Sequence, residues 1–299
     1  MEIHVDTFAE AYECLRHQLL MNGKNETPRG LLTKELLHVT FELRNPRARL
    51  WFHPERKFSL PFACAEATLL FDPTNYVSTI AFFNQRMRRF SDDGVHLYGD
   101  YGKRIASYLP DLVRKLRNDP STRQAIVPIL HIDDIRAETK DFPCTSTLHF
   151  LIRENKLHLF VSMRSNDLYW GTGYDVFVFT ILQEILANEL DIEMGSYYHT
   201  AHSLHVYEQH FEWLKTMTGV QDIIFSVPYR LHDMLHLVLL AKQCKIMNEE
   251  AFSECPDAFE YVFEQYARKK RHLPLSEKSH YHAWTIPFLT HTHEALNDK

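Results

Sequence analysis

Residues 144–163, CTSTLHFLIRENKLHLFVSM, constrain the fold of this chain more strongly than any other stretch. Two apolar runs rich in β-branched and aromatic residues flank the polar turn RENK, and this order predicts a β-hairpin. A third run of the same kind, AIVPIL at residues 125–130, precedes the hairpin. The middle of the chain is therefore expected to form strands that pair locally.

Helical patterns surround these strands. Apolar residues recur at helical spacing, or apolar runs end at turn residues, in TFAEAYECLRHQLL (7–20), FACAEATLLF (62–71), TIAFFNQRMRRF (79–90) and SYLPDLVRKLRN (107–118). A long apolar helix is expected from Asp175 to about Asn188, and mostly helix after residue 210. Further strands are expected in ELLHVTFEL (35–43) and DIEMGSYYHTAHSL (191–204). Locally paired strands with helices packed on them predict an α+β fold.

Length, charge and hydropathy limit the classes of protein to which this chain is expected to belong. The 299 residues contain no internal repeat and no low-complexity linker, so we expect a single domain over residues 1–299. A net charge of -6 gives no electrostatic reason to expect a nucleic-acid partner. No apolar run is long enough to span a membrane, and the start of the chain lacks the order of a signal peptide. These features predict a globular protein without a membrane or nucleic-acid partner.

The cysteines and glycines add two expectations. The 5 cysteines include no C-x-x-C pair and are odd in number, which favours free thiols and a cytoplasmic location. The 9 glycines include no G-x-G-x-x-G and no Walker-type loop. If the protein handles a nucleotide, side chains such as arginine have to hold its phosphate.

Cys144, in FPCTSTLHF, is a candidate nucleophile. A lone cysteine is most often a small core hydrophobe, and composition alone favours that interpretation. A nucleophile needs a nearby cation to stabilise its thiolate, and the candidates are Arg29, Arg123 and Arg164. The sequence does not place these three relative to Cys144.

Four positions have both a functional and a structural interpretation. Glu66 is the only charged residue in an apolar run. It either lies on the solvent-exposed side of an amphipathic helix or is a proton-transfer group with a raised pKa. Arg123 precedes a strand, where it is either a functional cation or a member of a surface ion pair that contributes little to stability. His205 and Tyr207 alternate in strand fashion, so both point into one cavity or both are satisfied core residues.

Histidine is abundant, with 19 residues, but no metal site is predicted. HDMLH places His232 and His236 one helical turn apart without the glutamate of H-E-x-x-H. The terminal HTHEALNDK has the composition of a polar tail. Neither pattern carries a complete ligand set.

Asp175 is an acidic residue directly before the apolar run VFVF. An ionised carboxylate is costly to bury, so it is paired, protonated or given to a ligand. One alternative is a helix N-cap, a role that aspartate fills well. The other is contact with a bound substrate.

Taken in order, five motifs resemble the thymidylate synthase superfamily: GDYGKR, NDPSTRQAIV, PCT, MRSND with GTGYDV, and SLHVYEQH. The resemblance runs from about Arg29 to His210, with a helical part after it. Within the superfamily, the hairpin sequence and GSYYHTAHSLHVY are most similar to the deoxycytidylate or cytidylate 5-hydroxymethyltransferase type. The resemblance implies a mixed sheet covered by helices and a homodimer formed through the sheets.

The resemblance also implies roles for the candidate residues. Cys144 would add to C6 of a pyrimidine ring, and Glu66 would organise water and protons near C4 and C5. Arg164 and Ser165 would hold the 5′-phosphate together with Arg29, and Arg123 would reach it from the other subunit. Asp167 would lie near the folate, and His205 with Tyr207 would bind the sugar hydroxyl.

At the position of Asp175, thymidylate synthases carry an asparagine. Its amide can donate to uracil O4 and accept from N3–H, whereas a carboxylate accepts from the N4 amino group of cytosine. The resemblance therefore implies hydroxymethylation of CMP or dCMP, with 5,10-methylenetetrahydrofolate as co-substrate and water completing the reaction. The alternatives are a uridylate-type methyltransferase or hydroxymethylase, and a non-catalytic nucleotide- or RNA-binding regulator.

Four departures from the family pattern accompany these roles. Gln124 follows Arg123 where the family usually has a second arginine, and Thr145 follows Cys144 where thymidylate synthases usually have histidine. Ser203 replaces an acidic residue near the His-Tyr motif. The end of the chain, PFLTHTHEALNDK, does not match the segment that closes thymidylate synthases over the folate.

Overall fold

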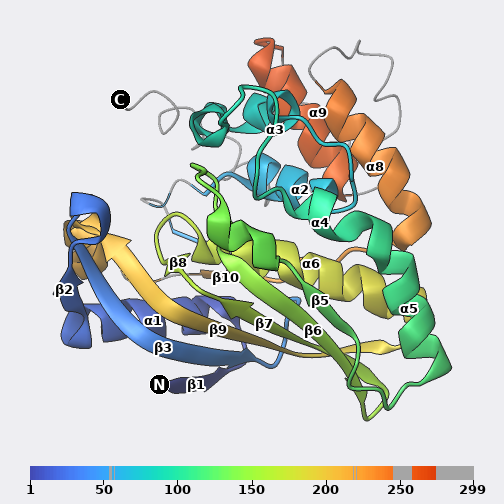
Figure 1. Cartoon of the computed structure of the whole chain (residues 1–299), viewed down its shortest axis with the longest axis horizontal. Helices are drawn as coiled ribbons and strands as arrows, with labels where there is room; N and C mark the ends of the chain where they lie inside the picture. The colour runs from blue at the N-terminus through green and yellow to red at the C-terminus, as the bar shows by residue number, and fades with distance from the viewer. Residues whose placement is uncertain (54–55, 57, 218, 220, 245–257, 274–299) are drawn as a thin grey trace. The chain divides into compact units, whose positions relative to one another are not determined.

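The computed structural model describes all residues except 54–55, 57, 218, 220, 245–257 and 274–299 (Figure 1). Its described residues belong to two compact units. The first unit comprises residues 1–55, 109–136 and 143–226, and the second comprises residues 56–108, 137–142 and 227–299. Each unit is described by itself, and the single domain expected over the whole chain stays a prediction.

A mixed sheet dominates the described part of the first unit (Figure 1). Its strands follow the order β1 (Glu2–Val5), β3 (Thr33–Leu43), β9 (Glu193–Tyr207), β7 (Lys156–Met163), β6 (Thr145–Arg153) and β5 (Ile126–Pro128). Two short strands pair at the margins, β2 (Lys24–Glu26) with β3 and β8 (Asn166–Asp167) with β9. β1–β3 and β7–β9 are parallel pairs, and β3–β9, β5–β6 and β6–β7 are antiparallel. The expected mixed sheet and α+β class are confirmed.

The predicted hairpin is present as β6 and β7. Arg153 pairs with Lys156, so Glu154 and Asn155 alone form the turn. Both have positive φ, 52° and 57°, the backbone that two-residue turns need to match the twist of the strands. The turn sets the register of the hairpin from Arg153 to Thr147, and an irregularity between Thr145 and Thr147 shifts it by one residue at the opposite end.

Helices α1 (Phe8–Asn22) and α6 (Thr172–Leu190) pack against the sheet. Thr7 and Glu10 form a capping box that begins α1 where its apolar stripe starts. The expected helix after Asp175 is α6, but it begins three residues earlier, at Thr172, and is almost entirely buried. Alternate residues of β6 and β7 fill the core beneath it: Leu148, Phe150, Leu157, Leu159 and Val161.

The opposite face of the sheet carries aromatic and polar side chains. The rings of Phe160 and Tyr198 stack with centroids 4.4 Å apart and planes 3° from parallel. The Tyr198 hydroxyl donates to Glu42 across the strands at 3.0 Å. Phe160 is 36% exposed, so this face offers apolar surface to solvent.

Smaller elements complete the first unit. They are β4 (Leu50–Phe52) and β10 (Gln221–Ile223), which pair with each other, the helices α5 (Leu109–Asn118) and α7 (Phe211–Thr216), and the short 3-10 turns η1 (Pro28–Gly30), η4 (Ile132–Arg136) and η5 (Glu208–His210). β4 is tied to α6 by a buried ion pair in which Arg49 Nη2 lies 2.6 Å from Glu184 Oε2. Arg47 Nε reaches the other oxygen of Glu184 at 2.8 Å. The C-terminal half of α6 is therefore fixed by charge as well as by packing.

The described part of the second unit is mainly helical. It contains α2 (Leu60–Leu69), α3 (Val77–Phe83), α4 (Tyr101–Ile105), α8 (Leu231–Gln243), α9 (Ala258–Lys270) and the 3-10 turns η2 (Gln85–Phe90) and η3 (Ala106–Tyr108). The single helix expected over residues 79–90 is wrong in its second half. The Asn84 side chain accepts from the Arg86 main-chain N–H at 3.1 Å, which ends α3 and starts η2. Among the described helices, none has the length and apolarity needed to cross a membrane.

Candidate functional site

Cys144 and Arg164 meet at one end of the hairpin. Cys144 directly precedes β6 and Arg164 directly follows β7, so antiparallel pairing brings the two residues together. The Arg164 main-chain N–H donates to the Cys144 carbonyl at 2.9 Å, and its guanidinium Nε donates to the Pro143 carbonyl at 2.8 Å. Guanidinium Nη2 then lies 3.9 Å from Cys144 Sγ. Of the three arginines considered, Arg164 is the cation placed to favour a thiolate at Cys144.

The segment after Arg164 continues to β9. Asp167 pairs with His205 through the parallel β8–β9 contact, and the Leu168 main-chain N–H donates to the His205 carbonyl at 2.8 Å. The rings of His205 and Tyr207 lie 5.4 Å apart at 87°. The structure therefore brings Cys144, Arg164, Ser165, Asp167, His205 and Tyr207 together on one connected part of the sheet.

His205 retains binding capacity. Its Nδ1 is buried and has no hydrogen-bond partner within the part of the chain that the structure describes. Glu35 of β3 is its register partner, and the Ser203 hydroxyl donates to the Glu35 carboxylate. An acidic residue thus lies beside the His-Tyr motif although Ser203 is not acidic, and no local sequence pattern predicts this contact.

Asp167 orders the loop between β8 and α6. Its Oδ1 accepts from the main-chain N–H groups of Tyr169 at 2.8 Å and Trp170 at 3.0 Å. The Tyr169 ring stacks on His210 with centroids 3.6 Å apart, and the Trp170 ring stands edge-on to the same imidazole. Trp170 is 36% exposed, so an aromatic side chain is partly accessible to solvent in the loop that Asp167 orders.

Asp175 is not a helix N-cap. The N-cap of α6 is Gly171, and Asp175 lies in the first turn, where its Oδ2 accepts from the side-chain amide of Asn166 at 2.8 Å. A Cβ added at Gly171 would lie 3.1 Å from that same oxygen, so only glycine leaves this contact undisturbed. Burial raises the pKa of Asp175 to about 7, the bond from Asn166 opposes this shift, and the nearby charge of Asp167 adds to it.

Asn166 belongs to a buried polar network that sequence reasoning missed. Its Oδ1 faces the Thr172 hydroxyl at 2.8 Å and His199 Nε2 at 3.2 Å. His199 Nδ1 in turn meets the Tyr197 hydroxyl at 2.8 Å. Burial lowers the pKa of His199 to about 3, so the imidazole is neutral. The alternation of β9 could have assigned Tyr197 and His199 to one buried face, but no local pattern pairs them with Asn166.

Arg29 and Arg123 are both exposed and lie in segments outside the hairpin. Arg29 is exposed in η1 with a φ of 54°, and η1 precedes β3, whose Thr33 pairs with Tyr207. Arg123 is exposed, and its carbonyl faces His149 Nε2 at 3.1 Å, five residues along β6 from Cys144. Five residues of strand span roughly 17 Å, so Arg123 does not reach the thiol of its own chain.

Glu66 lies in the second unit, on α2. The other nine residues of α2 are buried, and Glu66 alone is partly exposed. This burial pattern agrees with the apolar surroundings expected for it. Its role toward the pyrimidine stays a prediction.

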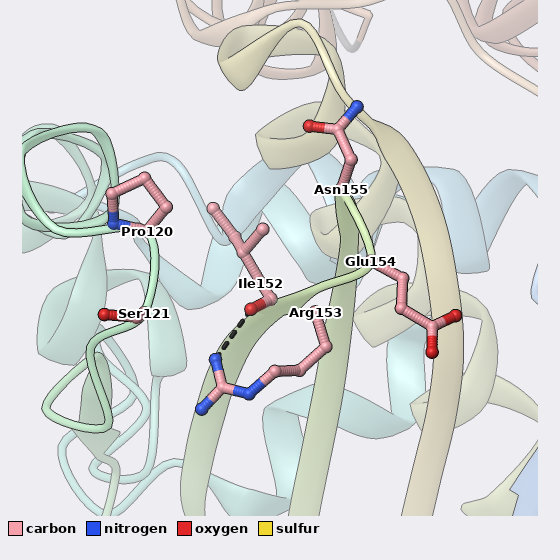
Figure 2. A pocket seen from close by; sticks show the side chains of 6 residues that line it. All are labelled: Pro120, Ser121, Ile152, Arg153, Glu154 and Asn155. Carbon is pink, nitrogen blue, oxygen red and sulfur yellow. Dashed lines mark hydrogen bonds between the residues drawn. The ribbon is translucent and has the colours of Figure 1, made fainter.

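A pocket at the tip of the hairpin, the histidines considered for a metal site and the C-terminal tail remain to be located. A pocket of about 460 Å³ is lined by Pro120, Ser121, Ile152, Arg153, Glu154 and Asn155, none of which was predicted as a site residue (Figure 2). Figure 2 shows Arg153 bending back toward the Ile152 carbonyl at the tip of the hairpin. His236 Nε2 contacts Glu260 at 2.7 Å, and no cluster able to hold a metal ion occurs in the described ranges. The HTHEALNDK tail and the rest of the divergent C-terminus lie outside the described residues.

Comparisons with known proteins agree with this architecture. Residues 81–222 match the family model described as thymidylate synthase. The solved structure of thermostable thymidylate synthase A from Bacillus subtilis superposes with a TM-score of 0.62, covering 73% of this chain and 86% of that one at 20% identity. The expected thymidylate synthase-like fold is therefore confirmed.

Curated relatives include proteins named deoxyuridylate hydroxymethyltransferase. The protein from Bacillus phage SP01 is 35% identical over 216 residues, which is 66% of this chain and 56% of the relative. The protein from Pseudomonas phage M6 is 31% identical over 57% of this chain and 51% of the relative. The thymidylate synthase of Bacillus phage phi3T is 35% identical over 35% of this chain and 37% of the relative. The chain spans about half the length of the two hydroxymethyltransferases, and these bear a uridylate name rather than the cytidylate name we expected.

Proposed function

We propose that this chain belongs to the thymidylate synthase superfamily, as the match over residues 81–222 supports, and is a pyrimidine nucleotide C5 hydroxymethyltransferase. Its substrates would be a pyrimidine nucleoside 5′-monophosphate, 5,10-methylenetetrahydrofolate and water. The products would be the 5-hydroxymethyl nucleotide and tetrahydrofolate. Deoxyuridylate is the first candidate substrate, because relatives that match most of this chain's length bear that name.

The pairing of Cys144 with Arg164 carries the proposal. A thiol 3.9 Å from a guanidinium, at the end of a rigid hairpin, has the environment of an activated nucleophile. Addition of the Cys144 thiolate to C6 would make C5 nucleophilic toward the one-carbon unit. After C5 has gained that carbon and lost its proton, tetrahydrofolate would leave the carbon, and water would add to the resulting exocyclic methylene as the thiolate leaves C6. Covalent attachment thus divides one difficult carbon–carbon bond formation into easier steps.

The surrounding residues would hold the nucleotide. Arg164 is exposed and Ser165 half-buried, next to each other and to the nucleophile, as a 5′-phosphate contact would require. His205 has an unused buried Nδ1 and stands beside Tyr207, which suits a sugar hydroxyl. Glu66 would manage water and protons near C4 and C5.

The loop of Asp167 fits a folate. Methylenetetrahydrofolate, when bound, supplies the one-carbon unit. Trp170 offers it an exposed aromatic face, and Asp167 holds that loop in place through two main-chain N–H groups. This chain's own part would be to orient the folate above C5 and to admit water.

A second subunit would complete the phosphate site. Arg123 lies too far along β6 to serve its own Cys144, and it is exposed. The sheet face that carries Phe160 and Tyr198 is partly apolar and could pack on a second copy. A homodimer through the sheets, with Arg123 supplied across the interface, accounts for both observations.

A cytidylate substrate is the second candidate, and Asp175 is the observation that favours it. A carboxylate at this position accepts from an amino group, as cytosine N4 offers, whereas uracil O4 only accepts. The opposing indications from Asp175 and from the relatives concern the base alone. The reaction type is the same for both.

One assay tests the function and separates the substrates. The protein is incubated with methylenetetrahydrofolate and, in turn, dUMP, UMP, dCMP and CMP, and products are identified by mass. We expect a 5-hydroxymethyl product from at least one nucleotide with wild type and none with Cys144→Ala. A 5-methyl product would identify a methyltransferase instead, and no product from any nucleotide would contradict the proposal.

A further inference from the structure

Asp175 ends a chain of buried hydrogen bonds that uses only one of its two carboxyl oxygens. The chain runs from Tyr197 through His199 and Asn166 to Asp175 Oδ2. Asp175 Oδ1 receives no hydrogen bond from any residue that the structure describes. One oxygen is therefore fixed by the protein and the other is left for a ligand.

The direction of the chain follows from its donors. The Asn166 amide nitrogen donates to Asp175 Oδ2, so Asn166 Oδ1 is an acceptor and the single N–H of the neutral His199 imidazole is assigned to Nε2. His199 Nδ1 is then the acceptor of the Tyr197 hydroxyl. The Thr172 hydroxyl also points at Asn166 Oδ1, from 2.8 Å. The Asn166 amide nitrogen then faces Asp175 Oδ2 as a donor. Because Oδ2 already accepts this N–H, a proton on neutral Asp175 belongs on Oδ1.

We propose that Asn166 and His199 are positioning residues that make Asp175 a two-state reader of the pyrimidine base, accepting uracil as the neutral acid and cytosine as the carboxylate. This inference rests on the proposed function and extends it to the choice of substrate. The neutral acid presents an Oδ1–H donor, which matches the O4 acceptor of uracil. The carboxylate presents Oδ1 as an acceptor, which matches the N4 amino group of cytosine.

The groups around Asp175 keep both states within reach. Asp167 on β8 contributes a negative charge, and Tyr197 and His199 on β9 are buried and neutral. Burial and Asp167 favour the acid, while the Asn166 bond favours the carboxylate, and the balance holds the pKa of Asp175 at about 7. An asparagine here has no second state. A two-state Asp175 thus accounts for both indications about the base: the carboxylate, which suits cytosine, and the names of the relatives, which refer to uridylate.

Nucleotide binding measured against pH tests the two states. Calorimetric titrations give the dissociation constants of dUMP and dCMP from about pH 5.5 to about pH 8.5, and their ratio cancels the ionisation of the 5′-phosphate. We expect preference to shift toward dCMP by about tenfold per pH unit, because a single proton separates the two complexes. In Asp175→Asn the ratio should stay constant across the range.

The positioning role has a readout without nucleotide. Carbon NMR of the Asp175 carboxyl gives its titration midpoint in wild type and in Asn166→Leu. Loss of the N–H bond to the charged form should move the midpoint up by about one pH unit or more. His199→Phe should move it in the same direction, since the Asn166 amide loses the partner that orients it.

Gln183→Leu is the matched control. Gln183, on α6, is a buried side-chain amide like Asn166. It donates to the main-chain carbonyls of Leu157 and Gly195 and not to Asp175. Its loss should lower stability and leave the Asp175 midpoint in place.

Each remaining outcome has a definite meaning. If both nucleotides bind and their ratio is independent of pH, the proposed function stands and the two-state reader is wrong. If neither binds at any pH, the proposed function fails and the reader fails with it. If the midpoint is unchanged in Asn166→Leu, Asn166 does not position Asp175.

Discussion

The guanidinium Nη2 of Arg164 lies 3.9 Å from Sγ of Cys144, and their main chains are joined by a hydrogen bond of 2.9 Å. The two residues come from opposite strands of one hairpin, so the register of β6 against β7 sets this distance. The two-residue turn at Glu154 and Asn155 sets the register of most of the hairpin, and the irregularity between Thr145 and Thr147 shifts it by one residue next to Cys144. The candidate nucleophile and its nearest candidate cation are thereby brought together within a locally encoded element.

Cys144 should be indispensable to the reaction. We expect Cys144→Ala to abolish exchange of the nucleotide's C5 hydrogen with solvent, since exchange requires the covalent adduct at C6. Cys14→Ala, at an exposed cysteine on α1, should exchange at the wild-type rate. Normal exchange in a folded Cys144→Ala protein would rule out Cys144 as the nucleophile.

Arg164 should control the reactivity of this thiol even without substrate. Arg164→Gln removes the neighbouring cation, so the thiolate fraction falls and alkylation of Cys144 by iodoacetamide at neutral pH should slow by about tenfold, the equivalent of about 1.4 kcal/mol. Arg153→Gln, an exposed arginine at the other end of the same hairpin, is the control and should leave the rate unchanged. Equal rates in wild type and both variants would show that Arg164 does not activate Cys144.

The sequence predicted the elements that depend on local pattern. The hairpin, α1, the long buried α6 and β9 all follow from periodicity and turn residues, and Cys144 was expected directly before a strand. Pairing β6 with β7 then requires Arg164 to meet Cys144. This part of the site could be predicted because close neighbours along one hairpin build it.

Contacts between residues far apart in the sequence could not be predicted from local patterns. Asn166, His199 and Glu35 come from three different strands, and only the register of the sheet brings each to its partner. The N-cap role considered for Asp175 is wrong because α6 begins at Thr172, and its N-cap is Gly171, four residues before Asp175. Periodicity identifies a helix well but places its first residue poorly, since capping depends on backbone geometry.

The active site should be shared between two subunits. Arg123 is separated from its own Cys144 by roughly 17 Å of strand, so we expect each site to use Cys144 of one subunit and Arg123 of the other. In a dimer of one Arg123→Glu chain and one Cys144→Ala chain, one of the two sites then keeps both groups. Mixing the two inactive variants should restore up to about a quarter of wild-type activity, the share of intact sites in a random mixture of dimers. Activity is measured after subunit exchange has been verified with tagged chains. Verified exchange without any recovery would contradict a shared site.

The ion pair beneath α6 should matter for stability. Glu184 and Arg49 are both buried, and Glu184→Gln would leave Arg49 charged without its carboxylate. Breaking a buried pair from one side typically costs about 3–5 kcal/mol, so the free energy of unfolding in urea should fall by that order. Glu193→Gln removes a partner from the exposed Lys156 pair and should cost less than about 1 kcal/mol. Similar losses in the two variants would mean that burial adds nothing to the first pair.

Asp175 should make the folded state less stable as the pH rises. Its pKa is about 7 in the folded protein, above the ordinary value near 3.9 that it regains on unfolding. The folded state therefore holds a proton that the unfolded state releases, and the stability from this proton is complete below about pH 4 and lost as the pH rises to about 7. For a half-buried group the total loss is about 2–4 kcal/mol.

Asp175→Asn should remove this pH dependence. Asparagine does not titrate and its oxygen can still accept from Asn166, so the variant should match wild type near pH 4 and exceed it by about 2–4 kcal/mol near pH 8. The measurement is urea unfolding at both pH values, with Asp133→Asn, at an exposed residue of η4, as the control whose difference from wild type does not change with pH. Asp175 would then be a residue that lowers stability at neutral pH and is suited to a substrate. A variant that is less stable than wild type at pH 8 would instead make the Asp175 carboxylate a structural partner of Asn166.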